Sequence, residues 1–130
     1  MNPTRERLAA VDVVRSEVAM ETVATVVKML EEGEGTVSQK LAQATKLKDL
    51  IVKNYSLASH PEEYDPAITE FKKGLIAWGE AVSKETSKKD IVTSRSIRMD
   101  ITQLIGELDK GTEKALRSKL KPQEQLQQAA

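Results

Sequence analysis

The sequence predicts an all-α fold, either a four-helix antiparallel bundle or an elongated assembly of helical hairpins with coiled-coil-like seams. Two observations predict this class. Apolar residues recur at alternating spacings of three and four, which is the period of one helix face. Aromatic residues make up only 3% of the chain and charged residues 31%, so the core must consist mainly of Leu, Ile, Val and Ala.

We expect one helical domain over residues 1–121, followed by a disordered tail over 122–130. A chain of 130 residues is long enough for a single domain with a real core. The number of helices follows from the apolar periodicity and from the residues that start and stop helices. The expected helix ranges are 3–31, 36–58, 65–86 and 89–121.

The first expected helix starts at Asn2 and Pro3, a capping residue followed by one that is well tolerated in a first helical turn. Its apolar residues project onto one side, which we expect to face the core. That side carries Leu8, Val11, Val14, Val18, Ala19, Val23, Val26 and Leu30. Asp12 and Arg15 lie at its margin, where their spacing of three predicts a surface ion pair. The Gly-Glu-Gly segment at 33–35 then ends the helix.

The second expected helix opens at Thr36, which forms a capping-box pattern with Gln39. Its apolar residues follow at helical spacing, and they are Val37, Leu41, Ala44, Leu47, Ile51, Tyr55 and Ala58. The short connection to the first helix predicts that these two helices are antiparallel neighbours. The periodicity fails between Ser56 and Pro66, where we expect a loop.

The third expected helix begins at Asp65 and carries a strict apolar seam that includes the only Phe and the only Trp. The seam residues are Ile68, Phe71, Leu75, Trp78 and Val82. Gly74 and Gly79 indicate the close approach of a neighbouring helix, with a hinge as the alternative. After Val82 the next seam positions hold Glu85 and Lys89, which are charged. This break favours a turn at 86–89, with Ser87 as a cap, over one continuous helix.

The fourth expected helix carries a second strict seam that changes character along its length. The bulky half of this seam is Ile97, Ile101, Leu104 and Leu108. Its continuation is small, with Gly111, Ala115 and Ser118, and we expect Pro122 to end the helix. The first and fourth helices look longer than the other two. We therefore expect the small half of the seam to lack a partner within the chain.

The sequence carries no pattern that predicts catalysis, a cofactor or a metal site. It has no cysteine, and it lacks the Gly-rich phosphate loops and the nucleophile motifs of known enzymes. The single histidine, His60, lies in a polar loop. Di-metal carboxylate bundles need a Glu three residues before a His, and that position holds Leu57. We expect a protein that is not an enzyme and that binds no cofactor and no metal.

The net charge and the hydropathy of the chain indicate its compartment and its class of partner. Twenty basic and twenty acidic residues give a formal net charge of zero, which argues against binding to nucleic acid through the overall field. No segment has the length and apolar character of a signal peptide or of a membrane span. We expect a soluble cytoplasmic protein that does not contact membranes, and export by a route without a cleaved signal stays open.

Two functional hypotheses follow. The first is a non-enzymatic protein-interaction or assembly module, such as an adaptor, a chaperone or a structural subunit, that binds a protein partner or a second copy through the fourth helix. Its contact candidates are Ile101, Leu108, Gly111, Ala115 and Ser118. The alternative is an accessory nucleic-acid-binding subunit. Its contact candidates are Lys88, Lys89, Arg95, Arg98, Lys114 and Arg117. We also expect the protruding ends of the first and fourth helices to pair with another chain.

Overall fold

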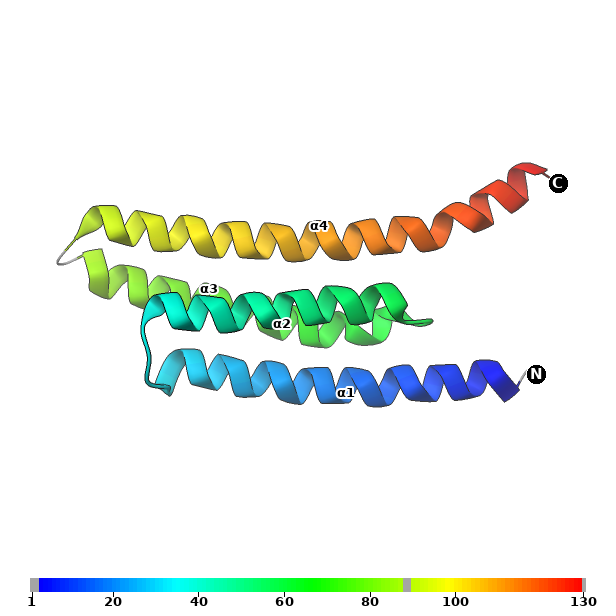
Figure 1. Ribbon diagram of the computed structural model, residues 1–130, viewed down its shortest axis with the longest axis horizontal. Coiled ribbons are helices and arrows are strands. Elements are labelled where there is room, and N and C mark those ends of the chain that lie inside the picture. Colours follow the sequence, from blue (N-terminus) through cyan, green and yellow to red (C-terminus); the bar gives the residue numbers. More distant parts are fainter. Residues whose placement is uncertain (1–2, 88–89, 130) are drawn as a thin grey trace.

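Four α-helices make up most of the described part of the chain. The structure, a computed structural model, describes the backbone of residues 3–87 and 90–129 and the side chains of residues 11–86 and 90–119. Its helices are α1 (Pro3–Glu32), α2 (Val37–Leu57), α3 (Asp65–Ser87) and α4 (Ile91–Ala129), and a short 3-10 helix, η1 (Pro61–Tyr64), precedes α3. The predicted all-α helical bundle is confirmed (Figure 1).

The connection between α1 and α2 has the local structure that the sequence predicts. Gly35 has a φ of 128°, in the left-handed region that favours glycine. The capping box is confirmed, because Thr36 Oγ1 accepts the backbone N–H of Gln39 at 3.1 Å and Gln39 Oε1 accepts the backbone N–H of Thr36 at 3.0 Å. These contacts end one helix and start the next within residues 33–36.

The predicted separation of α3 from α4 is confirmed, but the predicted cap is wrong. Ser87 is the last residue of α3, and Asp90 caps α4 instead. Its Oδ1 accepts the backbone N–H groups of Val92 at 3.1 Å and Thr93 at 3.3 Å. A carboxylate serves here because it accepts both amides and suits the positive end of the helix dipole. The hydrogen bonds from Thr93 hold the pKa of Asp90 below its usual value.

The far end of α4 differs from the prediction. The helix continues through Pro122 to Ala129, so the expected helix end at Lys121 is wrong. Proline removes one backbone N–H and crowds the preceding turn, which can bend a helix without ending it. Figure 1 shows the α4 ribbon changing direction in its orange-to-red part.

The helices differ in length as predicted. α1 has 30 residues and α4 has 39, whereas α2 has 21 and α3 has 23. The N-terminal end of α1 and the C-terminal end of α4 extend beyond the other helices at the same end of the bundle (Figure 1). Both long helices are therefore covered over only part of their length.

Neighbouring helices are partly antiparallel and partly parallel. α3 packs against α4 and α1, and α2 packs against α4. Figure 1 shows that α1 and α3 run in one direction while α2 and α4 run in the other, so the α1–α3 and α2–α4 neighbours are parallel. α1 and α2 are antiparallel neighbours as predicted, but they touch less than these other pairs. The α1–α2 side of the bundle is consequently less closely packed than these three pairs.

The core joins the predicted seams of α3 and α4 to residues from the other two helices. Its buried members include Val23 and Leu30 of α1, Leu47 and Ile51 of α2, Phe71, Leu75 and Trp78 of α3, and Ile97, Ile101, Leu104 and Leu108 of α4. Each seam is buried because the strict three-four spacing keeps its members on one side of the helix.

Two glycines of α3 lie where neighbouring helices come closest. A Cβ at Gly74 would overlap the isopropyl group of Val27 on α1, and a Cβ at Gly79 would lie 2.5 Å from Cδ1 of Ile101 on α4. At Gly74 a larger residue would push α1 and α3 apart, whereas at Gly79 it would meet only the flexible end of the Ile101 side chain. The predicted close approach is therefore confirmed at both positions.

Candidate functional site

The apolar contact residues predicted on α4 lie mostly inside the bundle. Ile101 and Leu108 belong to the core, and Ala115 is buried with them. Ser118 is exposed. Buried side chains cannot meet a partner in the folded chain, so this set does not form one accessible surface.

Gly111 and Ala115 of the small half of the α4 seam pack within the chain, so the expectation that this half lacks a partner is wrong for both of them, whereas Ser118 is exposed. A Cβ at Gly111 would lie 2.8 Å from Cγ1 of Val52 on α2. Near the end of the same contact, the Lys119 ammonium donates a hydrogen bond to the backbone carbonyl of Ala58. The seam is small because α2 runs parallel to α4 at close range and occupies that space.

The first group of predicted nucleic-acid contacts lies near the start of α4. Arg95 is exposed. Arg98 donates a hydrogen bond from Nε to the buried Ser83 Oγ at 2.6 Å, which engages the guanidinium with α3. Lys88 and Lys89 fall outside the described residues. One of the two described arginines is therefore partly engaged within the fold.

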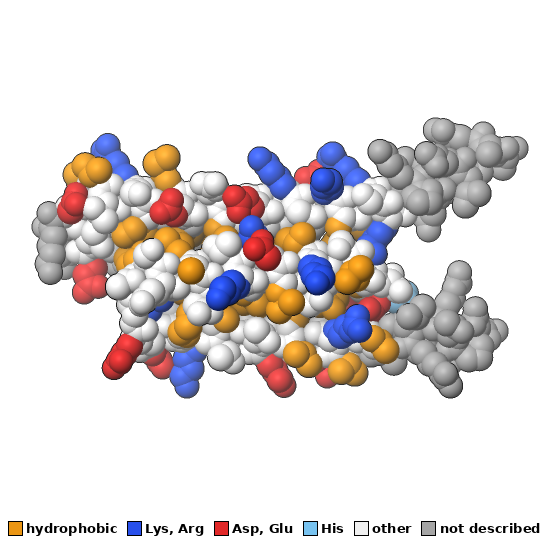
Figure 2. All heavy atoms as spheres, viewed as in Figure 1, with side chains coloured by type: hydrophobic (Ala, Val, Ile, Leu, Met, Phe, Trp, Pro, Cys, Tyr) orange, Lys and Arg blue, Asp and Glu red, His pale blue; other side chains and the backbone are white. Residues whose placement is uncertain are grey.

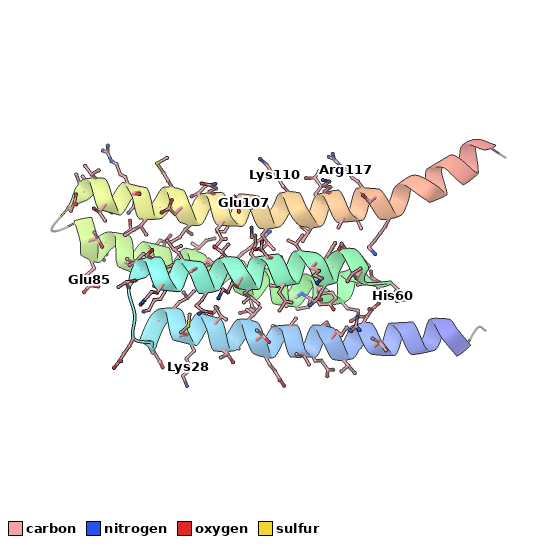
Figure 3. All side chains as sticks on the ribbon, in the orientation of Figure 1. Lys28, His60, Glu85, Glu107, Lys110 and Arg117 are labelled. Carbon is pink, nitrogen blue, oxygen red and sulfur yellow. The ribbon has the colours of Figure 1, made fainter. Side chains whose placement is uncertain are left out.

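The second group lies further along the same helix. Lys114 is exposed, and Arg117 forms an ion pair with Glu113. Figure 3 shows Lys110 and Arg117 projecting away from the bundle. A rise of 1.5 Å per residue separates Arg95 from Arg117 by roughly 33 Å. The predicted contacts thus form two separate groups and not one patch.

Residues 11–18 of α1 present a different face to the core from the predicted one. Val11, Val14 and Val18 are exposed, although the apolar projection placed them inside. Asp12 and Ser16 take the inner positions, and Asp12 is only 4% exposed. A polar stripe is buried here while a valine stripe faces outward, which is the reverse of the usual pattern.

Asp12 is turned inward because it holds the connection between α2 and α3. Its Oδ2 accepts the backbone N–H of His60 at 2.7 Å, which satisfies a partly buried amide. Tyr64 is fully buried nearby, and burial, followed by the Asp12 charge, raises the pKa of its hydroxyl. The predicted surface ion pair between Asp12 and Arg15 is therefore wrong.

A groove runs along the open side of the bundle between α1 and α2. This α1–α2 groove, of about 220 Å³, is lined by Val14 and Val18 of α1 and by Leu50 of α2, with Ala19 and Ile51 deeper in. Val14 is 58% exposed, Val18 55% and Leu50 50%. The groove exists because the valine stripe of α1 points past α2 and not into the core.

The groove is flanked by further apolar side chains and by cations. On α2, Lys46, Leu50, Lys53 and Leu57 are exposed, and their spacing of four, three and four places them along one edge. Arg15 lines the groove, and its lining includes no acidic residue. Figure 2 shows hydrophobic and basic side chains interspersed on this face of the molecule.

We use the name α1–α2 face for the groove together with its flanks. The flanking residues are Val11, Lys46, Lys53 and Leu57. No protein-family model, curated protein or solved structure matches this chain. The face therefore has to be interpreted from its own chemistry, which is apolar in the middle and charged at the edges, as in many protein–protein contacts.

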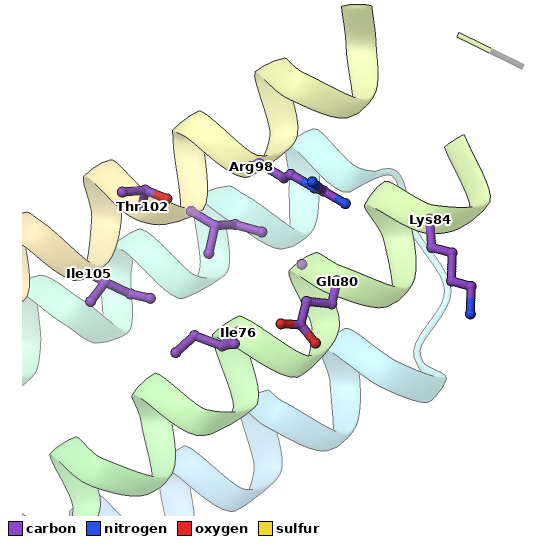
Figure 4. Close-up of a pocket in the computed structure, with 8 residues that line it drawn as sticks. Ile76, Glu80, Lys84, Arg98, Thr102 and Ile105 are labelled. Atoms are coloured by element: carbon purple, nitrogen blue, oxygen red, sulfur yellow. The ribbon is translucent and has the colours of Figure 1, made fainter. Parts of the chain in front are cut away.

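Two larger cavities lie beside the glycines of α3. The α3–α4 cavity, of about 500 Å³, has Ile76 and Glu80 on one side and Arg98 and Ile105 on the other (Figure 4). The α1–α3 cavity, of about 560 Å³, lies next to Gly74 and is lined by two acidic and two basic residues. Because charges of both signs line each cavity, neither one favours a ligand of a particular charge.

The single histidine among the described residues lies beside a carboxylate. His60 Nδ1 lies 3.1 Å from Glu62 Oε1 near the surface. Residues 11–86 and 90–119 hold no group of three or more His, Asp and Glu side chains placed to bind a metal ion. In the described chain, no helix combines the length and the apolar character that crossing a bilayer requires.

Sequence reasoning missed the residues that form this candidate site. The apolar projection of α1 places Val14 and Val18 in the core, and the apolar spacing of α2 does not include Leu50. One signal was present, because Asp12, Ser16, Ala19 and Val23 follow the same four-three-four spacing as the apolar seams. Two polar residues in that register indicate a buried polar contact at this level.

Proposed function

We propose that this protein is a non-enzymatic protein-interaction or assembly module whose contact surface is the α1–α2 face. The supporting observation is the pair of half-exposed valines, Val14 and Val18, aligned with Leu50 across an open groove. Valine and leucine have no polar end to keep in water, so their exposure in one contiguous patch is most economically explained by a partner surface.

The fixed register of α1 supports this proposal. Asp12 accepts the His60 amide only while it faces inward, and this orientation keeps the valine stripe outside. α1 therefore cannot rotate to bury Val14 and Val18 without leaving a partly buried amide unpaired. A protein partner that covers the face removes the apolar surface from water and leaves the internal contact intact.

The proposed class of function is the one that the sequence predicts, but the proposed contact surface lies on α1 and α2 instead of on α4. An adaptor, a chaperone or a subunit of a larger complex can use the α1–α2 face, whereas Ile101 and Leu108 of α4 are committed to the core. Pairing through the protruding ends of α1 and α4 stays a prediction. The cysteine-free composition supports a cytoplasmic location for such a module.

Photo-crosslinking tests the proposal directly. A photoreactive phenylalanine derivative at Leu50 should yield a protein adduct in the native host. The same group at Ile76 on α3 provides the control, because Ile76 is 49% exposed and thus matches Leu50. Adducts from position 50 and not from position 76 support the proposal. Equal adduct yields at both positions, or none at position 50, would overturn it.

Nucleic-acid binding through α4 is the second candidate function. The observation in its favour is that Glu107 and Asp109 of α4 pair with Lys48 of α2 and Lys72 of α3, which leaves Lys110 to dominate the outward charge nearby. Electrophoretic shift at two salt concentrations tests it, since phosphate contacts weaken steeply with salt. Absence of a shift at low salt would rule it out.

A further inference from the structure

We propose that the partner of the α1–α2 face is a second copy of this chain. The two copies are related by a two-fold axis parallel to the helices, so that α1 of each copy lies on α2 of the other. This inference rests on the proposed function of the α1–α2 face and adds the identity of its partner. Its basis is that the two edges of the face are complementary to each other in charge and that its apolar residues match in pattern.

The two edges of the face carry opposite charge. Lys46 and Lys53 are exposed along the outer edge of α2, and Glu17 and Glu21 are exposed on α1. A helical projection places the two glutamates beyond Val14 and Val18, on the side away from α2. Within the described residues, none of these four side chains has an ion-pair partner. Asp49 lies between the two lysines on α2 and pairs with Lys48 of its own helix, so each copy has one edge of net positive charge and one acidic edge.

The register of the two helices follows from the groove itself. Val14 and Val18 line it together with Leu50 and Asn54. Because α1 and α2 are antiparallel, Val18 lies level with Leu50, and Val14 lies level with Asn54. Moving along α1 by a given number of residues therefore corresponds to moving back along α2 by the same number.

A two-fold axis parallel to the helices keeps each residue at its level and exchanges the two edges. Glu21 of one copy then lies opposite Lys46 of the second copy, and Glu17 lies opposite Lys53 to within about one helical turn. Both pairs occur twice, as symmetry requires. Each edge of the dimer then holds two glutamates of one copy and two lysines of the other. A lysine side chain is long enough to bridge an offset of one helical turn, so each charge has a partner of opposite sign.

The apolar residues match in the same register. Val18 of one copy meets Leu50 of the second copy, and Val11 meets Leu57. A two-fold axis perpendicular to the helices would instead bring α1 onto α1 and α2 onto α2, which sets acidic edges against acidic edges. Charge therefore selects the parallel axis.

The size of the face suits a stable dimer. α2 has 21 residues, and a rise of 1.5 Å per residue makes it about 31 Å long. Two adjacent helices, each about 10 Å across, give a footprint of roughly 600 Å² per copy. Twice this area reaches about 1,200 Å², the lower end of the range for specific protein–protein interfaces.

Charge reversal provides the test. Size-exclusion chromatography with light scattering should give twice 14.4 kDa for the unmodified chain. The double variants Lys46→Glu/Lys53→Glu and Glu17→Lys/Glu21→Lys should each self-associate about tenfold more weakly or worse, because each makes both edges alike. An equimolar mixture should form a mixed dimer, since acidic edges then meet basic ones in both contacts.

The control is Lys110→Glu/Lys114→Glu, which makes the same change in charge on the outer side of α4 and should leave the dimer intact. Recovery in the mixture also establishes that both variants are folded. Dimers in either charge variant alone, or monomers in the mixture, would overturn the inference. A monomeric unmodified chain that still crosslinks to another protein from position 50 would overturn the dimer and leave the proposed function standing.

Discussion

Replacing Gly74 by alanine should destabilise the bundle, although alanine favours helix. A Cβ at this position would overlap the isopropyl group of Val27, whose Cγ1 would lie 2.9 Å away and whose Cβ would lie 3.2 Å away. Valine in a helix has one strongly preferred rotamer, so the group cannot swing aside and α1 has to move. Overpacking of this kind costs about 1 to 3 kcal/mol.

The gain in helix propensity offsets only part of that cost. Alanine is better than glycine in a helix interior by about 1 kcal/mol, so the expected net loss of unfolding free energy is roughly 1 kcal/mol. Gly106→Ala is the matched control. Nothing lies within 4 Å of a Cβ at Gly106, and that variant should gain about 0.5 to 1 kcal/mol.

Urea titration followed by far-UV circular dichroism measures both effects. A double-mutant cycle with Val27→Ala identifies their source, because removing the two methyl groups opens the space that the new Cβ needs. The penalty of Gly74→Ala should shrink by about 1 kcal/mol in that background. The reasoning fails if Gly74→Ala is as stabilising as Gly106→Ala, or if Val27→Ala leaves its penalty unchanged.

Three further predictions follow from the core, the α2–α3 connection and the α2–α4 contact. Leu108→Ala should lower the unfolding free energy by about 2 to 5 kcal/mol in the same titration, because it opens a cavity in the core. Asp12→Ala should lower it by about 1 to 3 kcal/mol through the unpaired His60 amide, while Arg15→Ala should change it little. Hydrogen bonds from Lys48 and Gln103 hold the pKa of Glu107 below its usual value, so its contribution to stability is full above the usual pKa and is lost as the pH falls through the lowered pKa. Stability of Glu107→Gln measured against pH should lack this acid-dependent step.

Most of the fold could be predicted because α3 and α4 each have only one strictly periodic apolar edge. Ile97, Ile101, Leu104 and Leu108 leave no choice of buried face, and the buried seam follows at once. The capping box at Thr36 is equally local. These features depend on residues within a few positions of one another, and sequence spacing describes such relations well.

The register of α1 could not be predicted in this way. Apolar residues cover much of its circumference, so Val14 and Val18 fit a core face as well as Ala19 and Val23 do. The choice is made by the hydrogen bond between Asp12 and His60, which are 48 positions apart. A contact of that separation depends on the finished fold.

The partner of the α4 seam was hidden for a related reason. Gly111 is small because Val52 approaches it, but this approach requires α2 to run beside α4 in the same direction. The length of a connection limits which helices can be adjacent and does not decide it. The candidate site depends on the same choice of adjacent helices, which the sequence does not determine. The α1–α2 groove is open only because α2 packs on α4.

The parallel pairing of α1 with α3 also bears on the order in which the chain folds. α1 and α2 leave the ribosome first, yet their mutual contact is smaller than the α1–α3, α2–α4 and α3–α4 contacts. α1 makes its larger contact with α3, and α2 makes its larger contact with α4. Both α3 and α4 are synthesised later. The α3–α4 hairpin closes locally, whereas the α1–α3 contact has to close a longer stretch of chain. Folding during synthesis therefore waits for the C-terminal half, and until then the core side of α1, with Val23 and Leu30, is exposed to whatever chains are nearby.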